Sequence, residues 1–148
     1  MEKVKFQVEH GLVIQSNVTQ EISHLKMSAE KWMRHQMGPS FTGIECGYPY
    51  ICAGILPIWE GRWEAWAAIS VKVRRREMLW AHRNVFAFLD TLQTGEPEKY
   101  RRVETTARSD QPNAQRWLEL LGFQKEGRLR CYDASGSDHI QYARISCP

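Results

Sequence analysis

The sequence lacks the residue patterns that bind metals or build disulfide frameworks. Its four cysteines (Cys46, Cys52, Cys131 and Cys147) form no C-x-x-C pair, and none lies at zinc-finger spacing from a histidine. A chain of 148 residues can bury a core without covalent help, so we expect reduced thiols, no metal site and a cytoplasmic location. The apolar neighbours of Cys52 and Cys131 predict that both thiols are buried on strands.

Long apolar runs and a strong charge of either sign are also missing. No apolar stretch approaches the ~20 residues that cross a bilayer, and the first residues lack the apolar segment of a signal peptide. The net charge of +3 is too small to indicate nucleic acid, although a slightly basic chain favours a small polyanionic ligand. We therefore expect no membrane and no nucleic-acid partner, and a nucleic-acid binder is the least favoured of three functional hypotheses.

What the sequence does contain is regular apolar periodicity. Alternating residues predict strands at 4–8, 48–56, 62–73, 101–107, 123–133 and 138–145. Spacings of three and four predict helices at 20–37 and 76–93 and a third from Asn113. Residues 12–14 would continue or pair with the first strand, and residues 41–47 would form a turn-rich loop. With no repeat and no linker, this order predicts a single domain over residues 1–148, an α/β (α+β) mixed sheet with helices on both faces.

The segment from Asn113 to Phe123 is the most informative part of the chain. Asn113 follows a proline and stands where a helix N-cap belongs. Gly122 can adopt the left-handed conformation that ends a helix, and Phe123 opens the next strand. The apolar side of the predicted helix consists of Trp117, Leu118, Leu120 and Leu121.

This segment, followed by E-G-x-x-R-x-Y at Glu126 to Tyr132, resembles the C-terminal half of the GCN5-related N-acetyltransferases, the GNAT superfamily. It is most similar to the ribosomal-protein branch, which has Leu rather than Tyr five residues before Gly-Phe. The predicted element order from about residue 45 to 146 also matches the second half of that fold. The resemblance implies a GNAT-like acyl-CoA N-acyltransferase fold with a mostly antiparallel central sheet; an ordinary helix packed on a strand is the alternative.

Four segments also resemble the small GNAT-like proteins of tailed phages and prophages. They are Gly47-Tyr48-Pro49, the W-E-G-R-W-E-A-W run at 59–66, Arg74-Arg75-Arg76, and residues 121–144. This resemblance implies a phage or prophage protein, located in the host cytoplasm or the virion.

The GNAT resemblance implies acetyl-CoA as cosubstrate, with its pyrophosphate at the start of the helix that follows the long strand. Both glycines of the family's phosphate loop are missing there, and only Ala81 is small. Arg74, Arg75 and Arg76 would supply charge for the phosphates, or they form a solvated helix start. The same resemblance assigns the backbone of Ile69, Val71 and Val73 to the pantetheine amides. It also assigns Asn113 and Arg116 to the CoA arm, with a plain N-cap as the other role for Asn113.

Acetyl transfer to an amine needs a base for the amine and an acid for the leaving thiolate. Glu64 is the only acidic residue on the predicted long strand, and burial among its apolar neighbours would strengthen it as a base. A rim carboxylate paired with an arginine is the alternative. Leu118 replaces the family's usual tyrosine, so Tyr132 is the candidate acid, unless it is a core or rim tyrosine.

Two functions of different classes follow from the resemblance. The first is acyl-CoA-dependent transfer of an acetyl group to an unidentified amine, on a small molecule or a protein, whose choice would be set by residues 15–20, 38–47 and 57–62. The second is a catalytically degraded GNAT-fold accessory or virion-associated phage protein that acts by binding, as the missing glycines and tyrosine indicate. A homodimer is expected by analogy with GNAT relatives only.

Overall fold

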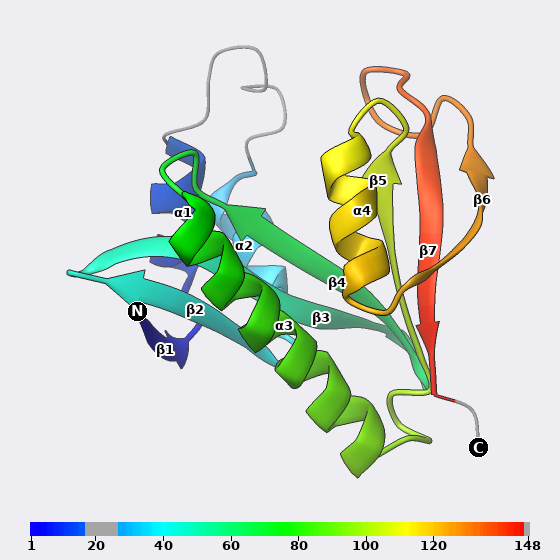
Figure 1. The fold of residues 1–148 in the computed structure, drawn as a ribbon, viewed down its shortest axis with the longest axis horizontal. Coiled ribbons are helices and arrows are strands. Elements are labelled where there is room, and N and C mark those ends of the chain that lie inside the picture. Colours follow the sequence, from blue (N-terminus) through cyan, green and yellow to red (C-terminus); the bar gives the residue numbers. More distant parts are fainter. Residues whose placement is uncertain (17–26, 147–148) are drawn as a thin grey trace. The chain divides into compact units, whose positions relative to one another are not determined.

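The computed structural model describes residues 1–16 and 27–146 (Figure 1). Its strands form one sheet in the order β1-β2-β3-β4-β5-β7-β6; β4 and β5 pair in parallel, whereas β1–β2, β2–β3, β5–β7 and β6–β7 are antiparallel. The predicted α/β fold with a mixed, mostly antiparallel sheet is confirmed. The elements are β1 (Glu2–Lys5), α1 (Val8–Ser16), α2 (Ala29–Arg34), β2 (Ser40–Glu45), β3 (Tyr48–Trp59), β4 (Arg62–Ile69), α3 (Arg75–Gly95), β5 (Arg102–Arg108), α4 (Pro112–Leu120), β6 (Gln124–Leu129) and β7 (His139–Ile145).

The contacts within the chain group into two compact units that interleave in sequence. The first unit comprises Met1–Pro57 and Ala65–Arg83, and the second comprises Ile58–Glu64 and Asn84–Pro148. Strands β3 and β4 and helix α3 therefore contribute residues to both units. None of the helices in the described part of the chain is both long and apolar enough to cross a membrane.

An aromatic cluster forms the core of the first unit. The rings of Phe6, Trp32 and Trp66 lie 5.1–6.2 Å apart; Phe6 and Trp32 are buried with Ile14 and Cys52, and the partly buried Trp66 packs against them. An added Cβ on Gly11 of α1 would lie 2.6 Å from the Trp32 ring, so the close approach of α1 and α2 requires glycine there. Burial raises the pKa of the Cys52 thiol to about 12, which leaves this thiol inert at neutral pH.

Three expectations for the first unit are wrong. Residues 12–14 belong to helix α1, because Leu12 and Ile14 pack into the aromatic cluster. Residues 41–47 are not a loop, since residues 40–45 form strand β2 in register with β3, with Phe41 opposite Ala53. Of the helix predicted at 20–37, α2 covers Ala29–Arg34, and residues 17–26 lie outside the described part.

Strand β4 is shorter than its alternating sequence predicted. It ends at Ile69 rather than Val73, because a turn follows in which the Val73 N–H donates to the Ser70 carbonyl at 3.1 Å. The Ser70 N–H donates to the Tyr50 carbonyl at 2.9 Å, and the Ser70 hydroxyl lies 2.9 Å from the Tyr48 hydroxyl. A buried serine that bonds to β3 thus fixes the point where the chain leaves the sheet.

In the second unit, helix α4 packs against β5 and β6 (Figure 1). Gly122 ends α4 with a φ of +87°, as predicted, and the Phe123 N–H donates to the Leu118 carbonyl at 3.1 Å. The side chains buried on the α4 side of the sheet include Val103, Ala107, Ile140 and Tyr142.

Two predictions for the second unit are wrong. Asn113 is not the N-cap of α4: that position is Gln111, which makes no side-chain capping bond, and Pro112 occupies the first turn. Cys131 is not a buried strand thiol, because β6 ends at Leu129 and Cys131 is exposed in the following turn with a φ of +49°. Apolar neighbours in sequence did not reveal that the hairpin turn starts this early.

Candidate functional site

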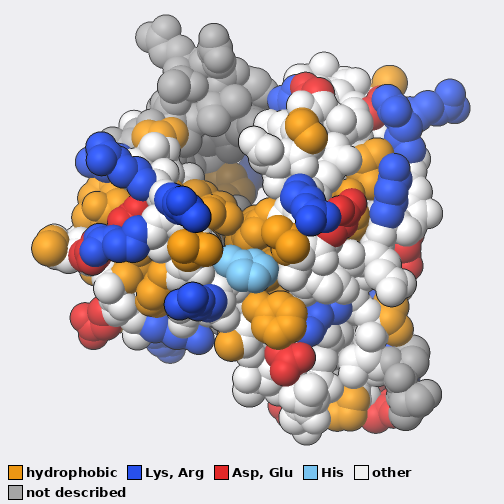
Figure 2. Space-filling model, viewed as in Figure 1, with side chains coloured by type: hydrophobic (Ala, Val, Ile, Leu, Met, Phe, Trp, Pro, Cys, Tyr) orange, Lys and Arg blue, Asp and Glu red, His pale blue; other side chains and the backbone are white. Residues whose placement is uncertain are grey.

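A surface pocket of about 470 Å³ lies at the start of α3 in the first unit, within the size range of small-molecule sites. Three of its side chains are cationic and two are anionic, so it offers a small excess of positive charge. We call it the helix-start pocket; it is lined by Glu45, Tyr50, Val71, Lys72, Arg74, Arg76 and Glu77. On the face shown in Figure 2, basic side chains stand among apolar and acidic ones rather than in a continuous stripe.

The carboxylate of Glu77 already occupies the start of α3. Its Oε2 accepts the N–H of Arg74, the residue before the helix, at 2.9 Å, and it is the third helical residue. This is one half of a capping box, in which a glutamate reaches back to the N-cap. The hydrogen bond from the Arg74 backbone, followed by those from the Glu77 backbone and the Arg76 side chain, holds the pKa of Glu77 below its ordinary value.

Arg76 links this cap to strand β2. Its Nε donates to Glu77 Oε1 at 3.0 Å, and its Nη2 lies 2.5 Å from Glu45 Oε2. Both ends of the guanidinium therefore have carboxylate partners, although the side chain itself is exposed. Arg74 and Arg75 are exposed as well, and the Lys72 ammonium lies 4.2 Å from the centre of the Tyr48 ring. An incoming anion would meet the side chains of Lys72 and Arg74 together with an arginine that is already paired.

The remaining cofactor candidates are placed as follows. Ile69 is the last residue of β4, Val71 is exposed, and the Val73 N–H is used in the turn after β4. Ala81 is buried in α3. In the second unit, Asn113 is exposed in the first turn of α4, and Arg116 is exposed with Glu119 at 3.7 Å.

Glu64 lies on a polar face of the second unit. It is opposite Glu104 of β5 in the parallel register, on the same side of β4 as Arg62, and its side chain is exposed. Burial was expected to strengthen Glu64 as a base, but the exposed side chain lacks that burial. Glu64 is exposed, as the alternative of a rim carboxylate expected, and Arg62, on the same side of β4, pairs with Glu104.

Glu104 is the buried carboxylate on this face. Arg62 and Arg102 both donate to it, Arg102 through Nε at 2.6 Å, and Arg102 also donates to Glu126 at 2.9 and 2.5 Å. Burial alone would raise the pKa of Glu104, but the two guanidinium groups outweigh it and hold the pKa below its ordinary value. Glu104 is therefore ionised and paired at neutral pH, which suits a structural anion better than a base.

The sequence pattern predicted Tyr132 on a strand, and this prediction is wrong. The residue lies in the turn between β6 and β7 with 52% of its surface exposed, and its ring centre is 5.0 Å from that of His139. Glu45, Glu77 and Glu104 are the groups that sequence reasoning missed. For Glu77 a signal existed, since the spacing from Arg74 is that of a capping box. Glu45 pairs with Arg76 of α3 and Glu104 with Arg62 of β4, and these pairings between residues far apart in sequence left no signal.

No metal centre is indicated by the described side chains. Within residues 1–16 and 27–146, no group of three or more His, Cys, Asp or Glu side chains could hold an ion. The described cysteines Cys46, Cys52 and Cys131 are free thiols.

Neither protein-family models nor curated protein sequences match the chain. Several solved structures do match the chain in fold. The ribosomal-protein-S18-alanine N-acetyltransferase from Escherichia coli matches with a TM-score of 0.77 at 16% identity, over 99% of this chain and 95% of that one. A GNAT-family acetyltransferase from Bacillus anthracis matches with a TM-score of 0.72 at 16% identity, over 97% and 93%.

A variant of the spermidine N-acetyltransferase SpeG from Vibrio cholerae matches with a TM-score of 0.72 at 12% identity, over 99% of this chain and 95% of that one. Identities this low establish the fold and nothing finer. Over nearly its whole length, this chain has the fold of the GNAT-type N-acetyltransferases.

Proposed function

We propose that the protein is an acyl-CoA-dependent N-acyltransferase that transfers an acetyl group from acetyl-CoA to an amine. The observation that carries the proposal is the match to N-acetyltransferase structures over 97–99% of the chain. The helix-start pocket supports it, because cationic side chains and a helix N-terminus together favour phosphate groups.

In this proposal Arg74, Arg75 and Arg76 bind the phosphates, and Ala81 is the small residue that the resemblance assigns to the phosphate site. The backbone of Ile69, Val71 and Val73 and the side chains of Asn113 and Arg116 contact the rest of the CoA arm. Acetyl-CoA supplies the activated thioester; Glu64 and Tyr132 remain the sequence-based candidates for base and acid. No metal takes part.

Glu77 makes this phosphate site different from an open one. A carboxylate at the helix start offsets the macrodipole and uses a backbone donor that a phosphate would otherwise take. Binding of the pyrophosphate by the backbone N–H of Arg74 would therefore require Glu77 to move or to become protonated, whereas the side chains of Lys72 and Arg74 could bind it with Glu77 in place. Replacing Glu77 by Gln removes the like charge and should strengthen binding.

Calorimetric titration with acetyl-CoA tests the proposal. We expect heat of binding in the wild type, roughly tenfold weaker binding in Arg74→Ala and Arg76→Ala, and tighter binding in Glu77→Gln. Arg83→Ala, an exposed arginine of α3 outside the pocket, is the matched control and should bind like the wild type. Absence of heat at millimolar acetyl-CoA would remove the proposal.

The acceptor is tested by measuring release of the CoA thiol in the presence of an amine. The two amines are spermidine and a peptide with N-terminal alanine, in line with the similar N-acetyltransferase structures. We expect turnover with at least one small-molecule or protein amine. We also place the protein in the cytoplasm and keep a homodimer as part of the proposal; sedimentation of the purified chain distinguishes one copy from two.

A second function is favoured by one observation, the closure of the α3 start by Glu77 and by the pair between Arg76 and Glu45. In this alternative the chain is a GNAT-fold phage or prophage accessory protein that has lost catalysis and acts by binding, in the host cytoplasm or the virion. Acetylation that disappears in Glu64→Gln would argue against it. Failure of acetyl-CoA to bind both the wild type and Glu77→Gln would favour it.

A further inference from the structure

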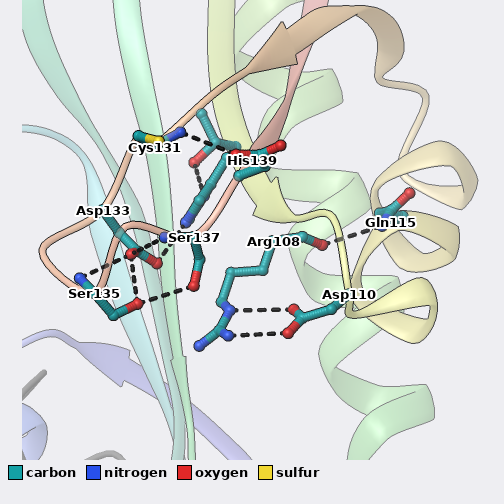
Figure 3. Close-up of polar contacts among 10 residues, drawn as sticks. Arg108, Asp110, Gln115, Cys131, Asp133, Ser135, Ser137 and His139 are labelled. Atoms are coloured by element: carbon teal, nitrogen blue, oxygen red, sulfur yellow. Dashed lines mark hydrogen bonds and ion pairs between the residues drawn. The ribbon is translucent and has the colours of Figure 1, made fainter.

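Three side chains of the second unit form a connected chain of hydroxyl, imidazole and carboxylate. Thr106 Oγ1 of β5 lies 2.9 Å from His139 Nδ1, and His139 Nε2 lies 3.0 Å from Asp133 Oδ2. Figure 3 shows Asp133 in the turn before β7, with His139 beside it at the first residue of that strand. Nothing in the sequence pattern indicated this arrangement, because the three residues come from two elements and a turn.

The Asp133 carboxylate is held in one orientation by the turn. Its Oδ1 accepts the N–H of Ser135 at 3.0 Å, the hydroxyl of Ser135 at 2.6 Å and the N–H of Ser137 at 2.9 Å (Figure 3). The other oxygen, Oδ2, is left to face His139. These hydrogen bonds, first that of the Ser135 hydroxyl and then that of His139, hold the pKa of Asp133 well below its ordinary value.

The ionised carboxylate decides the tautomer of His139. A carboxylate only accepts hydrogen bonds, so Nε2 must carry the proton of the neutral imidazole and donate it to Asp133. Nδ1 then has a lone pair, and the Thr106 hydroxyl donates to it. The oxygen of Thr106 is left with its own lone pairs, next to a base that can take its proton.

These groups lie on the polar face of the second unit. Thr106 is two residues beyond Glu104 and projects to the same side of β5, whereas Val103 and Ala107 project toward α4. The side chains of His139 and Asp133 keep 15% and 16% of their surface exposed, so both are partly accessible to solvent. Two arginines nearby are paired with carboxylates, Arg108 with Asp110 and Arg128 with Asp138.

We propose that Thr106, His139 and Asp133 form a proton relay that, in place of the exposed Glu64, accepts the proton of the acceptor amine during acetyl transfer, an inference that rests on the proposed function. The amine nitrogen attacks the thioester carbonyl, a C–N bond forms and the C–S bond breaks. Thr106 Oγ takes the amine proton as it passes its own proton to His139 Nδ1. Asp133 stabilises the imidazolium, CoA leaves as thiolate, and the proton returns to the thiolate or to water.

The test compares variants with a control from the same strand. His139→Gln and Thr106→Val should lower kcat about 100-fold, the lower end of what a positioned general base contributes. Thr105→Val removes the same hydroxyl one residue earlier, on the opposite face of β5, and should stay within about twofold of the wild type. Calorimetry with acetyl-CoA should give the same affinity for all four proteins, because the relay acts on the amine.

Three readouts separate chemistry from folding. In His139→Ala, added imidazole should restore part of the lost rate, as a soluble base replaces the missing one. In nitrogen-15 NMR spectra of the wild type, His139 should show a protonated Nε2 and an unprotonated Nδ1. Asp133→Asn, as a positioning variant, should lower kcat without changing the KM for acetyl-CoA.

The failures are distinguishable. If the wild type acetylates spermidine or the alanine peptide and His139→Gln does so equally well, the relay is overturned and the proposed function stands. If the wild type neither binds acetyl-CoA nor acetylates any amine, both fall. An acetyl group found on Thr106 by mass spectrometry would overturn the relay in favour of a covalent acyl-threonine route.

Discussion

Helices α3 and α4 are opposite in how they begin and end. Helix α3 is closed at its start by Glu77, whereas α4 begins at Gln111 without a side-chain cap. At the C-terminal ends the contrast is the opposite. Helix α4 is followed by Gly122 in the left-handed conformation that ends a helix, with a φ of +87°, whereas Gly95, the last residue of α3, does not have a positive φ. The backbone N–H and C=O groups of a helix terminus can therefore bind a ligand only where no side chain or backbone group of the protein already bonds to them.

This contrast bears directly on function. The sequence-based resemblance placed phosphate at the start of α3, where the Glu77 carboxylate already accepts the N–H of Arg74. Asn113, which was expected to close the start of α4, is exposed instead. An acyl-CoA enzyme of this fold must therefore displace Glu77 or bind phosphates mainly through the side chains of Lys72 and Arg74.

The largest effect is expected at the end of α4. Gly122→Ala forces a side chain into left-handed backbone, and the added Cβ would lie 3.2 Å from Arg144 Nε, so the free energy of unfolding should fall by about 1–2 kcal/mol. Gly95→Ala is the matched control: nothing lies within 4 Å of its Cβ, and the substitution should be neutral or stabilise by up to about 1 kcal/mol. Urea denaturation measures both, and equal effects would show that the two ends do not differ.

The next largest effect is expected at the start of α4. Gln111→Asp places a capping carboxylate where none acts and near the positive end of the helix dipole, so stability should rise by about 1 kcal/mol. The measurement is again the free energy of unfolding in urea. A loss of stability would mean that the backbone at this position does not permit capping.

A smaller effect, with a pH signature, is expected at the start of α3. The pKa of Glu77 is lowered by folding, so its contribution is complete above the ordinary value of 4.5 and is lost as the pH falls through the folded-state value. Glu77→Gln should therefore melt at a slightly lower temperature than the wild type at pH 7. This difference should shrink as the pH is lowered below 4.5. A pH-independent difference would show that the Glu77 carboxylate is not the cap.

The smallest effect is expected for Asn113→Ala. Because Asn113 is exposed within the first turn rather than at the N-cap, its removal should change the free energy of unfolding by less than about 0.5 kcal/mol. A loss near 1 kcal/mol would restore Asn113 as the cap and weaken the contrast between the two helices. Weaker acetyl-CoA binding at unchanged stability would instead support its proposed contact with the CoA arm.

Much of the second half of the fold could be predicted from sequence. The strands near 101–107 and 138–145, the helix near 76–93 and the stop at Gly122 follow from local periodicity and from one glycine. The first half was harder to predict. The apolar triplet at 12–14 resembles a strand but is helical, since Leu12 and Ile14 pack against a tryptophan from α2. Strand β2 carries a glycine because Trp80 packs against Gly43, and this partner is distant in sequence.

The candidate site shows the same division. The sequence by itself determined that Arg74 to Arg76 lie at the start of one helix and that a glycine follows the end of another, because these positions depend on neighbours within a few residues. Only the tertiary structure decided that Glu45 pairs with Arg76, that Arg62 pairs with Glu104, and that His139 lies between Thr106 and Asp133. Hydrogen bonds and ion pairs act over about 3 Å in space whatever the separation along the chain, so residues far apart in sequence carry no sign of them until the strands are paired.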